Sequence, residues 1–305
     1  MIRHAYVAPQ VSRKSRLHHV TVGDVIIYIV VSLLGFSMLY PFVNLVFQSV
    51  SPNWVITQAN GMLLWPQEVT FDNYLYVFQY PNVWNSYKNT IFVTIVGTSL
   101  SLVLSTLGGY SLSKRDLPGR FAMTMLILIT MWVSGGLIPG YLNLRRLGFL
   151  NTLWVMIIPD AISTGNLLLM RNFFLGMSEE LKESAYMDGA SEPVVLWKIV
   201  LPLSMPIIAT MALFYGVSNW NEYSTPLMYN SNDKLHTIQV VLQKMYNNSV
   251  QKIQDMDDLT SATSSIATEA VRSATVVFAT LPIIMVYPFL QKHFAKGVMV
   301  GSLKG

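Results

Sequence analysis

The sequence has 305 residues and a net charge of +4; 52% of its residues are hydrophobic and only 12% are charged. Soluble domains carry about 25% charged residues, so this composition excludes an ordinary soluble protein and favours an all-α membrane protein. The chain has no cysteine, which excludes disulfides, thiolate metal ligands and cysteine nucleophiles. Its five histidines show no pair at the spacing of a metal site on one helix face, and no metal is expected.

Residues 1–24 form a basic tail with Arg3, Arg13, Lys14 and Arg16. Positive charge of this kind is typical of cytoplasmic segments beside anionic lipid, so membrane lipid rather than nucleic acid is the expected neighbour. The apolar run that follows is longer than the core of a signal peptide and lacks a small-residue cleavage site. It is therefore predicted to be a retained membrane span.

Together with this first span, the remaining apolar runs predict six membrane-spanning helices within a transmembrane domain of residues 25–292, because about 20 apolar residues cross roughly 30 Å of hydrocarbon as a helix. The fourth and fifth spans are the weakest, because Asp160, Asn166, Asn219 and Asn221 interrupt them. The predicted spans are about 25–50, 90–112, 121–141, 153–173, 205–223 and 273–290.

The distribution of Lys and Arg predicts that both termini are cytoplasmic, including a C-terminal tail of residues 293–305. This orientation places most basic residues of the connecting segments inside, although Arg145 and Arg146 lie in a short outer loop. Two larger outer loops, residues 51–88 and about 224–272, follow the first and fifth spans. The first of these loops is rich in Trp and Tyr, which either anchor the chain at the membrane surface or pack on an external partner.

The inner loop of residues 177–206 has a pattern that predicts two short helices joined by a tight turn. Ser178 is placed to cap the first helix, and Gly189 can adopt the left-handed conformation that ends it. Ser191 can cap the second helix, with Pro193 in its first turn. Pro202 and Pro206 are expected to break that helix and return the chain to the membrane.

The polar face of this loop is acidic. Glu179 and Glu183 are four residues apart on one helix face, where they repel each other and favour a basic partner. The alternative is an amphipathic helix lying on lipid, but such helices prefer Lys and Arg on their polar face.

This loop resembles the EAA loop of the permease subunits of bacterial ABC importers. The pattern is Glu183-Ser184-Ala185, then Gly189, Ile199 and Leu201-Pro202, with Ser184 replacing the middle alanine of the family. The form Asp188-Gly189-Ala190 is typical of the carbohydrate branch. Residues 134–159 and 220–229 are similar to segments of maltose-type permeases, closest to those for oligosaccharides and polysaccharide fragments, and the C-terminus resembles their shared ending.

The resemblance implies that the loop is a coupling helix seated in a cleft of a cytoplasmic ATPase. Glu183 would pair with an arginine of that ATPase, Gly189 would make the turn, and Ala185 and Ala190 would allow close approach. The tail residues Gly301, Lys304 and Gly305 would reach the ATPase dimer, or else the tail is frayed.

The chain lacks the G-x-x-x-x-G-K-[ST] phosphate loop, so it is not expected to be an enzyme or to hold a cofactor. The resemblance implies that two ATPase subunits bind ATP and Mg²⁺. It further implies a second homologous permease subunit, an extracytoplasmic solute-binding protein and a carbohydrate substrate.

Polar residues within spans are costly and tend to face the bundle interior, which makes several of them candidates for the substrate path. The alternatives are polar helix–helix packing or a place at the membrane interface. Arg145 and Arg146 could attract an acidic sugar polymer, lipid headgroups or the binding protein. The path candidates are Asp160, Asn166, Asn219, Trp220, Asn221, Glu222 and Tyr223.

Three other functions compete with a sugar permease. The same machine could carry a peptide, polyamine or phosphonate, which the Asp-Gly-Ala form disfavours. An ion-driven secondary transporter would need no coupling loop, and the sequence shows no internal repeat to support one. A membrane-embedded enzyme would need a nucleophile–base pair or metal constellation, and none is found within one span.

Overall fold

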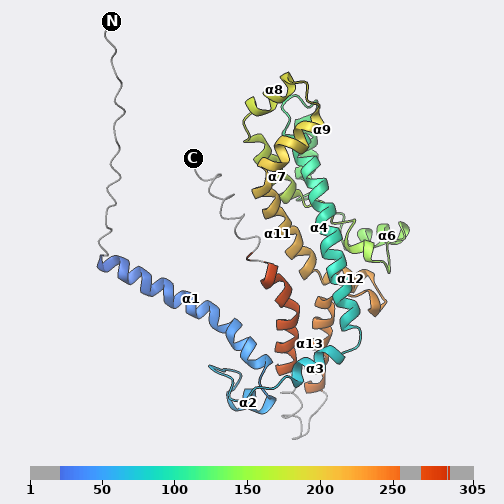
Figure 1. Cartoon of the computed structure of the whole chain (residues 1–305). Helices are drawn as coiled ribbons and strands as arrows, with labels where there is room; N and C mark the ends of the chain where they lie inside the picture. The colour runs from blue at the N-terminus through green and yellow to red at the C-terminus, as the bar shows by residue number, and fades with distance from the viewer. Residues whose placement is uncertain (1–20, 255–268, 287, 289–305) are drawn as a thin grey trace. The chain divides into compact units, whose positions relative to one another are not determined.

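The computed structural model describes residues 21–254, 269–286 and 288. Within these ranges every regular element is a helix and none is a strand (Figure 1). The chain divides between Asn44 and Leu45 into two units, which are considered separately.

The first unit contributes most of helix α1, Val22–Ser49, a helix of 28 residues. Asp24 accepts hydrogen bonds from the Thr21 amide at 2.8 Å and from the Thr21 hydroxyl at 2.7 Å, which caps the start of the helix. Nearly all side chains of the first unit are exposed, including its many aliphatic residues. A helix that is apolar all round is typical of a membrane span, in agreement with the predicted first span.

The second unit starts at Leu45 and is built around the long helix α4, Val83–Ser113. Its other elements, in chain order, are α2 (Asn53–Gln58), α3 (Asp72–Gln79), α5 (Arg120–Ile129), α6 (Leu137–Arg146), η1 (Leu153–Met156), α7 (Thr164–Leu175), α8 (Glu180–Met187), α9 (Glu192–Val195), the π-helix η2 (Leu196–Val200), α10 (Leu201–Leu203), α11 (Met205–Asn221), α12 (Ser224–Tyr229), η3 (Asp233–Leu235), α13 (Ile238–Gln254) and the helix Glu269–Val286.

Helix α4 packs closely against α7 and α11 because its buried face carries small residues. A Cβ atom added at Gly109 would lie 3.1 Å from the backbone nitrogen of Arg171, and one at Gly97 would lie 2.9 Å from Asn219 Nδ2. The Ser105 hydroxyl hydrogen-bonds the Tyr215 hydroxyl at 2.6 Å. In lipid the hydrophobic effect does not drive helix association, so helices are held together by close packing at small residues and by interhelical hydrogen bonds.

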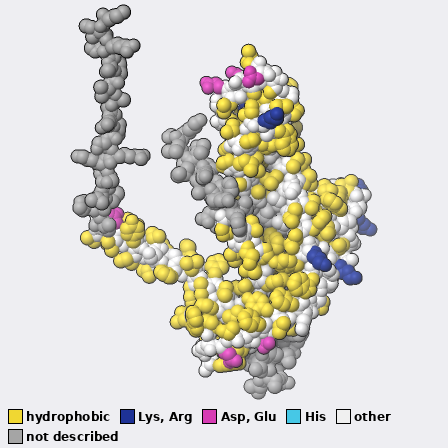
Figure 2. Space-filling view, in the orientation of Figure 1, with side chains coloured by type: hydrophobic (Ala, Val, Ile, Leu, Met, Phe, Trp, Pro, Cys, Tyr) yellow, Lys and Arg dark blue, Asp and Glu magenta, His cyan; other side chains and the backbone are white. Residues whose placement is uncertain are grey.

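Three described helices are long and apolar enough to cross a membrane: α1, α4 and Glu269–Val286. A fourth span arises if α9 to α10 and α11 are counted together, although they are bent by 79°. Figure 2 shows that hydrophobic side chains cover most of the visible surface of α4 and α11, whereas acidic side chains gather at the end that carries α8.

Two predicted spans are not continuous helices. In the third, residues 121–141, α5 ends at Ile129 and α6 begins at Leu137, after Gly136 with φ 81°. In the fourth, residues 153–173, the short η1 ends at Met156 and α7 begins at Thr164. The interruptions contain Gly135-Gly136 and Pro159-Asp160, residues that favour turns over helix interiors.

Candidate functional site

The predicted coupling loop folds as two helices with a tight turn. Helix α8 ends at a glycine in the left-handed region, Gly189 with φ 79°. The Ala190 amide donates to the Ala185 carbonyl and the Gly189 amide to the Tyr186 carbonyl, both at 3.0 Å. This pair of bonds is the Schellman motif, and it directs the chain into α9 after only four residues.

Two details of the loop differ from the prediction. The N-cap of α8 is Glu179 rather than Ser178, and no side chain caps it. The chain bends at Ser204, between Pro202 and Pro206, so Pro202 lies inside a helical run instead of ending it. The π-helical turn at Leu196–Val200 lies directly before Pro202, and such a wider turn makes room for a residue that lacks an amide hydrogen.

One face of the loop is packed against the unit. Val195 and Val200 are fully buried in a core cluster with Tyr110 and Phe174. Partly buried residues of the predicted motif, Ala185, Ala190 and Leu201, pack on this cluster, and Ile199 is half-buried. The loop is therefore held by side-chain packing as well as by its turn.

The opposite face is exposed and acidic. Glu183, Ser184 and Asp188 are exposed, as is Pro202. Among the residues that the structure describes, no ion pair or hydrogen bond engages the Glu183 carboxylate. Glu179 forms an ion pair with Arg115 at 3.0 Å, in which both side chains are more than half exposed.

A second contact joins the loop to the end of α4; we call it the Lys114 clamp, made of Tyr110, Lys114, Tyr186 and Glu192. Lys114 Nζ lies 2.5 Å from Glu192 Oε1 and donates to the Tyr186 hydroxyl at 2.7 Å. The Tyr186 and Tyr110 hydroxyls donate to the two Glu192 oxygens at 2.7 and 2.9 Å. The ammonium also lies 5.0 and 5.2 Å from the centres of the two rings, within cation–π range.

The electrostatics of the clamp favour a permanently charged lysine. Partial burial opposes the charge of Lys114, but the hydrogen bonds with Glu192 and the two tyrosines outweigh it and raise the pKa of the ammonium above its usual value. The pair therefore stays charged throughout the physiological pH range.

The clamp was not predicted from the sequence. Lys114 and Glu192 are 78 residues apart, and neither belongs to the motif that identified the loop. A basic residue at the end of one span and an acidic one in the next inner loop are common in membrane proteins, so the sequence carries no signal that pairs these two.

The predicted path residues fall into different environments. Asn219 donates to the Thr98 hydroxyl at 3.2 Å, and Trp220 is buried and donates from Nε1 to the Ala279 carbonyl at 2.9 Å. Both side chains thus contribute to packing between helices. Asn166 is half-buried on α7, whereas Asp160 is exposed in the segment before α7.

The remaining path candidates lie where α11 ends. Glu222 Oε1 accepts from the Thr225 amide at 2.8 Å and so supports the start of α12. Asn221 is exposed and accepts from Gln239 Nε2 at 3.2 Å. The Tyr223 side chain is exposed. The structure therefore places Asn221 and Tyr223, but not Trp220, with side chains open to the surface.

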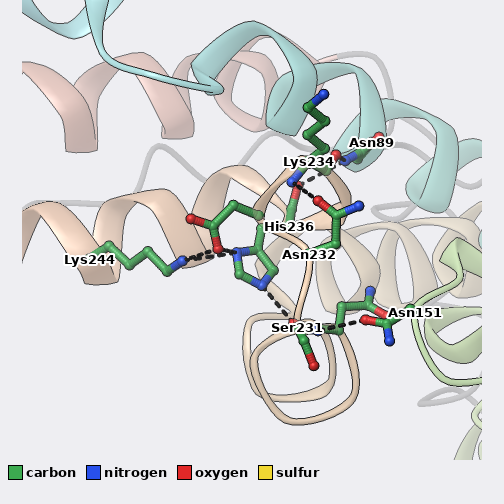
Figure 3. Close-up of polar contacts among 9 residues, drawn as sticks. Asn89, Asn151, Ser231, Asn232, Lys234, His236 and Lys244 are labelled. Atoms are coloured by element: carbon green, nitrogen blue, oxygen red, sulfur yellow. Dashed lines mark hydrogen bonds and ion pairs between the residues drawn. The ribbon is translucent and has the colours of Figure 1, made fainter.

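A polar cluster holds the segment after α12; we call it the His236 cluster, made of Asn89, Asp233, His236 and Lys244 (Figure 3). Asn89 donates to the carbonyls of Lys234 and His236 at 2.8 and 3.0 Å. The buried His236 ring contacts the Asn230 carbonyl through Nε2 at 2.9 Å. Lys244 Nζ lies 2.7 Å from Asp233 Oδ1 and 3.2 Å from His236 Nδ1.

The predicted tail contacts, Gly301, Lys304 and Gly305, lie outside the described residues. In the described part of the chain, no group of three or more His, Asp or Glu side chains is placed to hold a metal ion.

The comparisons with known proteins agree on one family. Residues 92–300 match the family described as binding-protein-dependent transport system inner membrane component. The polygalacturonan/rhamnogalacturonan transport system permease protein YtcP of Bacillus subtilis (strain 168) is 38% identical over 282 residues, 92% of this chain and 98% of that protein. Protein LplC of the same organism is 40% identical over 278 residues, 89% of this chain and 91% of its own length.

A solved structure is similar over the same extent. It is described as the crystal structure of a bacterial ABC transporter involved in the import of the acidic polysaccharide alginate. One of its chains matches with a TM-score of 0.78 and 32% sequence identity, covering 94% of this chain and all of that chain (100%). The matched family, YtcP and the structural neighbour are transport components, in agreement with the prediction that the chain is not an enzyme.

Proposed function

Because the chain belongs to the family of binding-protein-dependent transport system inner membrane components, we propose that it is the permease subunit of an ATP-driven importer for oligo- or polysaccharides. The relatives and the structural neighbour that support a carbohydrate cargo match nearly the whole chain. The neighbour's cargo, the acidic polysaccharide alginate, favours an acidic substrate.

The observation that carries the coupling role is the exposed acidic face of α8 on a loop that is fixed at both ends. Glu183 faces outward from α8, while the Schellman turn at Gly189 and the buried Val195 hold the helix pair in shape. A helix pair whose shape is already fixed loses little conformational entropy when it docks on a partner. It is therefore suited to seat in a cleft of an ATPase subunit, with Glu183 paired to a basic residue there.

The Lys114 clamp supplies a route by which movement of that ATPase reaches the membrane. Glu192 and Tyr186 belong to the loop, whereas Lys114 directly follows α4 and Tyr110 lies within it. Because α4 packs along both α7 and α11, displacement of the loop would move three helices as one body. This is a rigid-body mechanism of the hinge or rotation type.

In this proposal the chain has six spans with both termini in the cytoplasm, and the interrupted third and fourth spans each form one crossing. It works with a second homologous permease subunit, two ATPase subunits that bind ATP and Mg²⁺, and an extracytoplasmic solute-binding protein. The C-terminal residues Gly301, Lys304 and Gly305 reach the ATPase dimer. Asp160, Asn166 and the residues 219–223 border the substrate path.

The test is co-purification of the chain with sugar-importer ATPase subunits, comparing wild type with Glu183→Ala. Losing a charged hydrogen-bond partner at an interface costs about 2–5 kcal/mol when the other charge is left unpaired, so the variant should lose most of the assembly. Asp116→Ala is the matched control, since Asp116 is also an exposed carboxylate beside the end of α4 but lies outside the loop.

ATP hydrolysis is measured in the same preparations with and without the binding protein. The proposal requires stimulation in wild type and in Asp116→Ala, and its loss in Glu183→Ala. A wild-type chain that binds no ATPase subunit, or a Glu183→Ala variant that assembles and couples normally, contradicts it and reopens the ion-driven alternative.

A further inference from the structure

The segment between α1 and α4 exposes large apolar side chains to which the coupling mechanism gives no role. Leu64 is 83% exposed and Trp65 is 74% exposed. Met62, Val69 and Phe71 are exposed as well. Exposed apolar surface of this kind marks a place where another protein or a membrane makes contact. The sequence leaves both partners open for the aromatic residues of this segment, and the contacts of the segment distinguish them.

The exposed side chains lie on a segment that is packed and hydrogen-bonded. Gln48 Nε2, in the last turn of α1, donates to the Gly61 carbonyl at 2.7 Å. The ring centres of Phe47 and Trp65 are 5.7 Å apart. Leu63 is buried in a cluster with residues of α2, although its neighbours on both sides are exposed. The segment is therefore fixed beside the last turn of α1, with one set of apolar side chains inside and another outside.

The contact with Phe47 sets the depth of Trp65 in the membrane. The uncharged apolar run of α1 covers residues 25–43, and about 20 such residues cross the hydrocarbon as a helix. The polar Gln48 and Ser49 end the helix, so this last turn and Trp65 beside it lie at the level of the lipid headgroups. Tryptophan is enriched at this level because its ring is apolar while its N–H is polar.

A second pair of rings lies at the start of α4. Trp84, in the first turn of α4, stacks on Phe78 of α3 with 5.7 Å between the ring centres and 29° between the planes. Both side chains are exposed. The polar Lys88 and Asn89 separate Trp84 from the apolar run that follows. Trp84 therefore lies outside the hydrocarbon at the end of the second span, as Trp65 does at the end of the first.

The charge of the segment favours lipid over a protein partner. Residues 51–81 contain Glu68 and Asp72 as their only charged residues, so contact depends on apolar and aromatic side chains rather than on ion pairs. A protein that docks during part of a transport cycle would leave these side chains in water for the rest of it. Lipid covers them at all times, which removes the cost of exposing apolar surface to water.

We propose that Met62, Leu64, Trp65, Phe71 and Trp84 form a membrane anchor, which inserts into the boundary between lipid headgroups and acyl chains. This is the mode of binding of interfacial segments that do not span the bilayer. The anchor holds the last turn of α1 and the first turn of α4 at the same membrane depth. The inference depends on the membrane location of the chain and not on its cargo.

The absence of cysteine from the chain allows a direct test of the anchor, because one introduced cysteine carries a nitroxide spin label without background. Leu64→Cys and Met62→Cys place the label at two exposed positions of the anchor. Ser231→Cys is the matched control, since Ser231 is also exposed but lies in the polar connection between α12 and η3. The full-length chain is reconstituted in lipid nanodiscs. Collision of the label with oxygen, which concentrates in lipid, is compared with its collision with a water-soluble nickel complex.

Labels at Leu64 and Met62 should show a ratio of oxygen to nickel collisions several-fold higher than the label at Ser231. Replacing zwitterionic by anionic lipid should leave this ratio unchanged, because the segment has no basic residue. In the Leu64→Cys chain, Trp65→Ser should lower the ratio. Trp65→Tyr should keep it, because tyrosine also combines an apolar ring with a polar group.

The inference is overturned if the labels at both anchor positions meet the nickel complex as freely as the label at Ser231. It is equally overturned if they are shielded only after a solute-binding protein is added, since the surface then serves to dock that protein. Assembly with ATPase subunits is measured on the same labelled chains. Normal assembly with labels open to water shows that only the anchor is wrong, whereas labels in lipid on a chain that binds no ATPase support the anchor and contradict the proposed function.

Discussion

The second unit is held together differently at the coupling loop and at the His236 cluster. At the coupling loop, acidic side chains exceed their basic partners, and Glu183 is left facing outward. In the His236 cluster, side chains satisfy backbone carbonyls within the same unit, as Asn89 does for Lys234 and His236. The coupling loop thus leaves acidic side chains exposed, whereas the polar groups of the His236 cluster bond within the unit, and the proposed function gives only the first of them a partner to bind.

The difference follows from what each region must do. A coupling surface needs its charges available and its shape preserved, so packing and a glycine turn fix the backbone while the carboxylates stay exposed. A connecting segment between two helices needs its backbone groups satisfied, because an unpaired buried carbonyl costs free energy. The same residue types, Asn, Lys and acidic residues, therefore serve recognition in one place and loop closure in the other.

The largest effect is expected at the turn of the coupling loop. Gly189→Val places a β-branched residue at φ 79°, a conformation that costs an L-residue roughly 1–2 kcal/mol or more. An added Cβ meets nothing within 4 Å, so the effect comes from backbone strain alone. We expect the turn to open and ATPase binding to weaken about tenfold or more, measured by co-purification and titration.

Gly148→Val is the matched control. Gly148 also has a positive φ, 74°, with nothing within 4 Å of an added Cβ, but it follows α6 and lies outside the loop. It should lower thermal stability to a similar extent and leave ATPase affinity unchanged. Equal loss of affinity in both variants would mean that general destabilisation, not the shape of the loop, explains the result.

An intermediate effect is expected at the Lys114 clamp. Lys114→Met leaves the carboxylate of Glu192 without its cation, and because Glu192 is about half exposed we expect a loss of stability of about 1 kcal/mol. A double-mutant cycle with Glu192→Gln should show a coupling energy of similar size. Sugar uptake per ATP hydrolysed should fall several-fold, while assembly with the ATPase is kept.

The exposed pair Arg115–Glu179 is the control for the clamp, since it also links the end of α4 to the loop. The double-mutant cycle of Arg115→Met with Glu179→Gln should give a coupling energy close to zero, about 0–0.5 kcal/mol, because both side chains are largely in solvent. If this pair uncouples transport as strongly as the clamp does, the route through Lys114 is not specific.

The clamp should also be insensitive to pH under physiological conditions. A lysine whose pKa is raised on folding contributes stability that is fully present below its unfolded pKa and is lost only as pH rises through the folded value. The difference between wild type and Lys114→Met should therefore be constant from pH 6 to pH 9, as measured by thermal unfolding.

The sequence predicted the two helices and the turn of residues 177–206 well because their signals are local. Gly189 ends a helix through its own backbone freedom, and the spacing from Glu183 to Pro202 is a pattern within one segment. The helix bounds expected for the first and fifth spans also lie close to the observed ones: α11, for example, ends at Asn221, against a predicted end at 223. Helix α4 begins at Val83 rather than 90 because Ser86 and Thr90 are buried in tertiary contacts that no local pattern reveals.

The features that the sequence could not supply depend on long-range contacts. Trp220 was a sequence candidate for the substrate path, but its ring packs edge-on against Tyr87 and its Nε1 donates to the Ala279 carbonyl. The chain bends at Ser204 and not at a proline. The wider π-helical turn before Pro202 accommodates a residue that has no amide hydrogen, so the helix continues through Pro202. Both outcomes are set by neighbours far away in the sequence or by a rare backbone geometry.

The smallest effects on ATPase binding are expected in the His236 cluster, whose polar groups bond within the same unit. Asn89→Ala leaves two carbonyls without their donor; because one contact is exposed and the other part-buried, the variant should cost about 0.5–1.5 kcal/mol of unfolding free energy. Asp233→Asn removes the exposed ion pair with Lys244 and the contact with the His236 ring, and it should cost less than about 1 kcal/mol. Neither variant should change ATPase affinity, because the cluster faces no ATPase in the proposed arrangement.

The pH dependence of the second variant gives a sharper test. The hydrogen bond from Lys244 holds the pKa of Asp233 below its usual value. A carboxyl with a lowered pKa contributes stability above its unfolded pKa and loses it as pH falls through the folded value. The stability difference between wild type and Asp233→Asn should thus be constant from pH 8 to pH 5 and vanish only in strong acid. A difference that changes near neutral pH would contradict the assignment of this stability to the Asp233–Lys244 pair.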